Sequence, residues 1–155
     1  MAEKLPISKA AEYLLDECRM VLPGIQALFG FQLIVVFNAA FDEKLSRGEQ
    51  RIHLLAIAMI AIAIGIIMTP AALHRHKGPN EVTESFVRVS SRLLVLSMLP
   101  LALGISIDFF LISRIIVRGQ LAYMMTAALV DVFLLLWFIL PRARGLQRIV
   151  SGGSP

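Results

Sequence analysis

Long apolar stretches alternate with short charged stretches along this chain of 155 residues. Four of the apolar stretches reach the length of about 20 residues that a helix needs to cross a bilayer. They are rich in Leu, Ile, Ala and Met, and they are too long for ordinary buried strands, which favours helices. The sequence therefore predicts an all-α polytopic membrane protein with four transmembrane helices, at about residues 23–41, 54–73, 93–113 and 121–140.

The composition supports a membrane environment. Charged residues make up 17% of the chain and hydrophobic residues 57%, with a mean hydropathy of +0.77. A soluble domain has about 25% charged residues, so this chain has too few polar groups to cover a water-facing surface, and the lipid bilayer is its expected partner. The net charge of +4 does not indicate nucleic-acid binding. The basic residues flank the apolar stretches, where membrane topology places them.

The distribution of Lys and Arg predicts the orientation. Cytoplasmic connections carry an excess of basic residues. The two ends of the chain and the connection between the second and third spans share one side, which holds ten Lys and Arg against five on the other, so both termini are expected in the cytoplasm. The ten are Lys4, Lys9, Arg19, Arg75, Lys77, Arg88, Arg92, Arg142, Arg144 and Arg148, and the five are Lys44, Arg47, Arg51, Arg114 and Arg118.

The segment before the first span has its own pattern. From Ile7 to Leu22, apolar residues follow helical spacing opposite a face of alternating charges. This pattern predicts an amphipathic helix that lies along the inner leaflet, and Pro23 with Gly24 is expected to break it before the chain enters the membrane. The expected organisation is an interfacial helix at 1–22, a four-helix bundle at 23–142 and a cytoplasmic tail at 143–155 that is disordered at its end.

A second flanking helix is expected between the second and third spans. Asn80 follows a Gly-Pro pair and is a candidate N-cap for it. Val82, Phe86 and Val89 give this segment an apolar face. We expect the helix to continue directly into the third span.

Residues 17–31, with the sequence ECRMVLPGIQALFGF, resemble the signature of an uncharacterised family of small bacterial four-helix membrane proteins. Shorter similarities lie at 70–75 (PAALHR), 92–94 (RLL) and 137–142 (WFILPR), so the resemblance covers roughly residues 12–145. The resemblance implies the fold and a location in a bacterial inner (cytoplasmic) membrane. It implies no activity.

Two carboxylates lie inside predicted spans, Asp108 in the outer half of the bilayer and Asp131 near its midplane. An acidic residue at the centre of a membrane helix costs about 2.5–3.5 kcal/mol, so each is a candidate functional residue. Among the amides of the first span, Asn38 matches Asp108 in depth, and Gln32 is nearest to Asp131. These four residues could form a path for protons or a cation in an oligomer. Alternatively, they hold helices together by hydrogen bonds worth about 0.6 kcal/mol each.

Small residues recur on one side of the second span, at spacings that allow two helix backbones to approach closely. This ridge is either a packing seam inside the bundle or an interface between copies, and the sequence favours neither. Its members are Ala58, Ala61, Gly65, Thr69 and Ala72.

The basic cluster His74, Arg75, His76 and Lys77 is expected to bind lipid headgroups at the cytoplasmic surface. The two histidines alternate along a helix and point apart, and a third ligand is missing nearby, so we expect no metal site. Cys18 is the single cysteine, which excludes an intrachain disulfide.

The sequence contains no glycine-rich phosphate loop, no nucleophile elbow and no zinc-protease motif, so we expect neither an enzyme nor a bound cofactor. The favoured hypothesis is a non-enzymatic membrane protein that acts through helix packing, as a homo-oligomer or as an accessory subunit of a larger membrane complex. The alternative is a small oligomeric proton or cation channel that uses the intramembrane aspartates.

Overall fold

Helices form almost all of the part of the chain that the structure, a computed structural model, describes: residues 6–77, 83–117 and 119–143. Four of these helices are long and apolar enough to cross a membrane, as the sequence predicts. The elements are α1 (Ile7–Val35), α2 (Ala39–Lys44), α3 (Arg47–Lys77), α4 (Glu84–Val117) and α5 (Gln120–Phe133), which continues as the π-helix η1 (Leu134–Ile139) and the 3-10 turn η2 (Leu140–Arg142).

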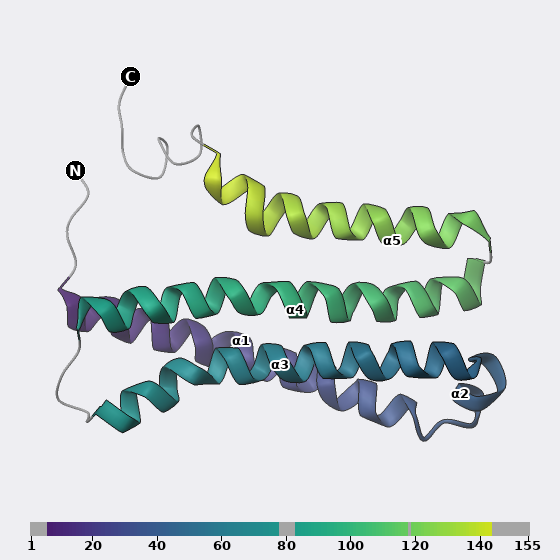
Figure 1. Cartoon of the computed structure of the whole chain (residues 1–155), viewed down its shortest axis with the longest axis horizontal. Coiled ribbons are helices and arrows are strands. Elements are labelled where there is room, and N and C mark those ends of the chain that lie inside the picture. Colours follow the sequence, from purple (N-terminus) through teal and green to yellow (C-terminus); the bar gives the residue numbers. More distant parts are fainter. Residues whose placement is uncertain (1–5, 78–82, 118, 144–155) are drawn as a thin grey trace.

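The long helices run side by side with alternating directions along the chain (Figure 1). Helix α4 lies between α3 and α5, and α1 packs against both α3 and α4. Helices α3 and α5 both begin at the end of the bundle where α2 lies. Because the connections are short, each long helix packs next to the one before it in the chain. Helix α5 packs mainly against one long helix, α4, whereas α1, α3 and α4 each pack against at least two others.

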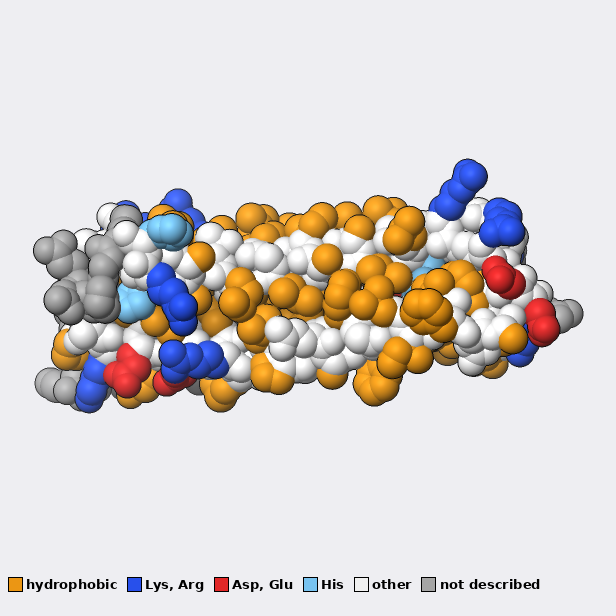
Figure 2. All heavy atoms as spheres, turned by 90° about the horizontal axis from the view of Figure 1, so that it is seen from below, with side chains coloured by type: hydrophobic (Ala, Val, Ile, Leu, Met, Phe, Trp, Pro, Cys, Tyr) orange, Lys and Arg blue, Asp and Glu red, His pale blue; other side chains and the backbone are white. Residues whose placement is uncertain are grey.

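The surface matches the requirements of a bilayer. Figure 2 shows charged side chains gathered at the two ends of the bundle, with apolar side chains covering the region between them. Large apolar residues are exposed on all four spans, as lipid-facing positions must be in a medium without water. The described residues thus form an integral membrane protein with four candidate spans.

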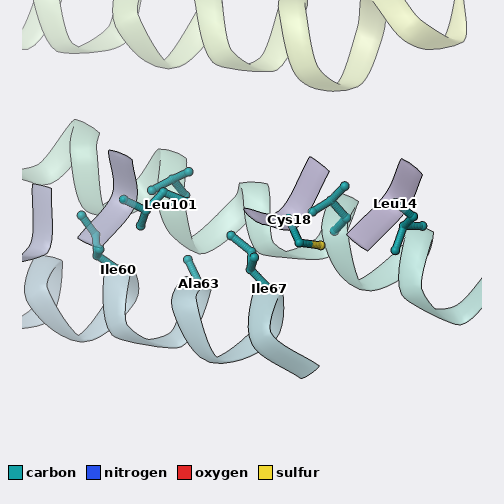
Figure 3. Close-up of a cluster of buried hydrophobic side chains, with 8 residues drawn as sticks. Leu14, Cys18, Ile60, Ala63, Ile67 and Leu101 are labelled. Atoms are coloured by element: carbon teal, nitrogen blue, oxygen red, sulfur yellow. The ribbon is translucent and has the colours of Figure 1, made fainter. Parts of the chain in front are cut away.

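The core lies where α1, α3 and α4 meet. Leu14 and Cys18 of α1, Ile60 and Ile67 of α3 and Leu101 of α4 belong to one buried cluster, in which Cys18 lies near Ile67 and Leu101 near Ile60 (Figure 3). Such apolar contacts hold the helices together by close packing, because lipid is as apolar as the side chains themselves.

Helix α3 packs tightly against α4 at Gly104. A Cβ atom there would lie 2.7 Å from Ile60 Cγ1 and 3.0 Å from the Ala56 carbonyl oxygen. A side chain at this position would therefore collide with Ile60 and lie tightly against the backbone of α3. Ser97 and Ser90, seven and fourteen residues earlier, are buried on the same side of α4, so small side chains recur along this side of the helix.

The expected break at Pro23 is absent. Helix α1 runs without interruption from Ile7 to Val35, with Pro23 inside it, and Leu14 and Cys18 lie in the bundle core. The prediction of a separate helix along the inner leaflet was therefore wrong, although its apolar face was identified correctly. A proline removes one backbone hydrogen bond, whereas ending a helix in apolar surroundings frees several backbone groups.

The first span ends earlier than expected, and Asn38 caps the next helix. Its Oδ1 accepts a hydrogen bond from the Ala40 amide at 3.0 Å. At the start of α3, Ser46 and Glu49 form a capping box: the Ser46 amide donates to Glu49 Oε2 at 2.9 Å, and the Glu49 amide donates to Ser46 Oγ at 3.3 Å. These side chains satisfy the backbone donors of the tight connection at this end.

Helix α4 includes both the expected flanking segment and the third span in one helix of 34 residues. At its start, Thr83 Oγ1 accepts a hydrogen bond from the Phe86 amide at 3.2 Å. The proposed cap at Asn80 and the tail at 144–155 lie outside the described residues.

Candidate functional site

Three polar side chains from three helices meet inside the bundle: Gln32 of α1, His53 of α3 and Asp108 of α4. Gln32 Nε2 donates a hydrogen bond to Asp108 Oδ2, and His53 Nδ1 lies 2.9 Å from Asp108 Oδ1. His53 Nε2 lies 3.2 Å from the backbone oxygen of Gln32. Gln32 and His53 are only 4% and 5% exposed, and Asp108 is partly buried, so the polar cluster lies largely inside the bundle.

The polar cluster can hold one proton with no net charge. Both nitrogens of His53 face oxygen atoms, and an imidazolium donates from both. An imidazolium beside an Asp108 carboxylate satisfies both contacts. A neutral ring satisfies them equally if Asp108 keeps the proton and donates it to Nδ1. Both arrangements avoid the large cost of an isolated charge in an apolar interior.

The polar cluster links α1, α3 and α4. The Phe41 ring packs edge-on against His53, with 5.4 Å between ring centroids, and closes one side of the polar cluster. Gln32 Oε1 is buried and has no hydrogen-bond partner among the described residues. Because each polar group sits on a different helix, the hydrogen bonds fix the rotation of α1, α3 and α4 relative to one another.

The structure pairs the predicted residues differently from the sequence analysis. Gln32 bonds to Asp108 and not to Asp131, while Asn38 caps α2 and does not reach Asp108. Asp131 is exposed on α5, and none of the described residues binds its side chain. The expected pairs were wrong because depth along a helix does not say which helix a side chain faces.

These four residues do not line a continuous path in one chain. Gln32 and Asp108 bond to each other, whereas Asn38 caps α2 and Asp131 is exposed on α5. Within the described residues, the four side chains therefore do not come together in one chain. A path for protons or a cation would have to be formed by several copies together, and the channel hypothesis stays a prediction.

Sequence analysis missed His53, although a signal was present. His53 lies six residues after the start of α3, about 9 Å along the helix axis, and Asp108 lies nine residues before the end of α4, about 14 Å. Since the two helices meet at that end, comparable depths could have suggested the contact.

The small-residue ridge of α3 lies on the outside of the bundle. Ala58, Ala61 and Gly65 are exposed, and a Cβ atom at Gly65 would have no neighbour within 4 Å. Thr69 is partly buried, and its Oγ1 donates to the Gly65 carbonyl oxygen at 2.9 Å. Of the two alternatives, a seam inside the bundle is thus excluded, and an interface between copies remains.

The basic cluster is partly accessible. Arg75 and His76 are exposed, and the His74 ring packs against Phe86 with 5.8 Å between centroids. The Lys77 side chain lies outside the described part. In the described ranges, no group of three His, Cys, Asp or Glu residues is arranged to hold a metal ion.

Comparison with known proteins gives one family. The model of a family of unknown function, DUF6328, matches residues 7–141, which cover all four candidate spans. No curated protein and no solved structure matches the chain.

Proposed function

The chain belongs to DUF6328, a family of unknown function, and we propose that it is a non-enzymatic membrane protein that works by assembling with further copies of itself. The observation that carries this proposal is the position of Asp131. Its carboxyl group faces outward from a helix that crosses the apolar layer.

Asp131 points directly away from its own bundle. It follows the fully buried Ala122 by nine residues, which places it about 180° around the helix. It lies eleven residues after Gln120, about 16 Å from the start of α5. A carboxyl group in lipid near this depth costs about 2.5–3.5 kcal/mol, and a neighbouring chain that covers it would remove much of this cost. The exposed Ala127 and Ala128 beside it leave room for such a neighbour.

The α3 ridge offers the matching surface. Gly65 follows the buried Ile60 by five residues and so points about 140° away from the side that faces α4. Ala58 lies eleven residues after Arg47, the same number that separates Asp131 from Gln120. Because α3 and α5 begin at the same end of the bundle, Ala58 and Asp131 lie at similar depths (Figure 1). A protonated carboxyl group could donate to a backbone oxygen exposed along the ridge.

The two surfaces lie on opposite sides of one protomer. Helix α4 separates α3 from α5 (Figure 1), so contact between α5 of one copy and α3 of the next is heterologous. Such contacts leave a free surface at each side and add copies until a ring closes. The paired helices would run in the same direction, as copies with one membrane orientation require.

Cysteine cross-linking tests this interface. In a Cys18→Ala background, a chain with both Ala58→Cys and Ala128→Cys should form a ladder of cross-linked species in membranes, because each copy joins two neighbours. Adding Asp131→Leu should weaken the ladder severalfold, because the polar contact is lost. The measurement is non-reducing gel electrophoresis after oxidation.

The single-cysteine chains are the controls. Neither should give more than background dimer. A strong dimer from Ala128→Cys alone would instead show a symmetric α5–α5 contact, and absence of any cross-link would contradict self-assembly and favour the accessory-subunit alternative. Ion flux in liposomes that disappears in Asp131→Asn would favour the proton or cation channel.

We also propose a bacterial inner-membrane location with both termini in the cytoplasm, supported by the ten-to-five bias of Lys and Arg. In the same Cys18→Ala background, Arg47→Cys should react with a membrane-impermeant maleimide added to intact cells. Lys9→Cys and Arg142→Cys should react only after the cells are opened. The reverse pattern would invert the orientation.

A further inference from the structure

A cavity of about 250 Å³ opens between α1 and α4 near the end where α2 lies. Most of its walls are apolar side chains, including Leu28 and Phe31 of α1 and Leu111 and Ile112 of α4, and the polar cluster of Gln32, His53 and Asp108 also lines it. Phe31 and Ile112 are also exposed to the surroundings of the bundle, so the cavity is open to the lipid at its side. Leu45 lines it from the connection between α2 and α3.

A second, larger hollow adjoins the apolar cavity. It has a volume of about 630 Å³, and four charged side chains line it: Glu43, Lys44, Glu49 and Arg114. Ile115 lines both hollows, so the charged one lies directly beyond the apolar one, toward the end of the bundle. Together they have the polarity of an amphiphile, with a charged mouth and an apolar interior.

The charged hollow carries two positive and two negative side chains. Arg114 pairs with Glu49 at 2.8 Å. Glu43 and Lys44 are exposed, and neither has an ionic partner among the described residues. A ligand with both a phosphate and an ammonium group can therefore satisfy charges of both signs, whereas a purely anionic headgroup leaves Glu43 facing negative charge.

We propose that the two hollows form one binding site for a phospholipid with an ammonium headgroup. The phosphate binds at Lys44 and Arg114, the ammonium group lies near Glu43, and one acyl chain enters the cavity between α1 and α4. Six residues of α4, about 9 Å of helix, separate Arg114 from Asp108. The cavity thus holds the part of the acyl chain that is next to the headgroup, and it ends at the polar cluster. It does not depend on assembly of copies, since its lining residues lie in one protomer.

Native mass spectrometry of the detergent-purified full chain tests the headgroup contacts. Phosphatidylethanolamine should remain bound severalfold more than phosphatidylglycerol of the same chain lengths. Lys44→Gln should reduce this retention severalfold, whereas Arg51→Gln, an exposed basic residue at the same end that does not line the hollow, should not. Equal retention of the two lipids would overturn the headgroup assignment.

A second pair of variants tests the acyl-chain cavity. Ile112→Trp should fill the cavity and reduce phosphatidylethanolamine retention, while Ile116→Trp, on an exposed position outside the cavity, should leave it unchanged. Glycerophosphoethanolamine, which has the headgroup without chains, should not be retained. Full retention in Ile112→Trp, or retention of the chainless compound, would overturn the proposal that an acyl chain occupies the cavity.

Discussion

Replacing Asp108 with leucine is expected to lower the free energy of unfolding by about 2–6 kcal/mol. The change removes the acceptor for both Gln32 Nε2 and His53 Nδ1. Each buried polar group that loses its partner costs about 1–3 kcal/mol, and both would be left inside the contact of three helices. Unfolding in mild detergent, followed by circular dichroism, measures the effect.

Asp131→Leu is the matched control, because it makes the same chemical change on another span. Asp131 is exposed and bonds to none of the described residues, so the protomer should keep its stability. A triple variant with leucine at positions 32, 53 and 108 should recover part of the loss, since no polar group then remains unpaired. Equal melting of Asp108→Leu and wild type would show that the polar cluster does not stabilise the bundle.

Gly104→Ala is expected to destabilise the bundle by about 1–3 kcal/mol, the usual cost of overpacking. The added Cβ would lie 2.7 Å from Ile60 Cγ1 and 3.0 Å from the Ala56 backbone oxygen, so α3 and α4 must move apart. The same detergent unfolding experiment measures the loss.

Gly65→Ala provides the comparison, since a Cβ there meets nothing within 4 Å. Alanine favours helix over glycine by about 0.5–1 kcal/mol, so this variant should be as stable as wild type or slightly more so. If Gly104→Ala behaved in the same way, the close approach of α3 and α4 would not be a feature of the folded protein.

The sequence predicted the four spans because each is a long apolar stretch, and that property is local. It did not predict the path of the chain at Pro23. The expectation that proline ends a helix applies where a turn can form hydrogen bonds with water. In a bundle surrounded by lipid, continuing α1 through Pro23 costs less free energy than ending the helix there, because fewer backbone groups lose their hydrogen bonds. The end of the first span was also predicted too late in the chain, because the apolar stretch continues past Asn38, whereas α1 ends at Val35 and Asn38 caps α2.

The polar cluster was only half predicted. Asp108 and Gln32 were recognised individually, because a carboxyl or amide group inside a span is costly and conspicuous. Their pairing depends on which helix faces α4 and at what rotation, and neither is a local property of the sequence. His53 was overlooked for a related reason: it lies close to the charged end of α3, where a polar side chain needs no special explanation.

The place of α5 in the row of helices also has a consequence for biosynthesis. The core and the polar cluster are formed by α1, α3 and α4, all of which leave the ribosome before α5. The contacts among these three helices thus need no residue of α5. Helix α5 then docks on α4 and carries Asp131 to the outside, so under the assembly proposed above the contact with a neighbouring copy is complete only when synthesis is nearly finished.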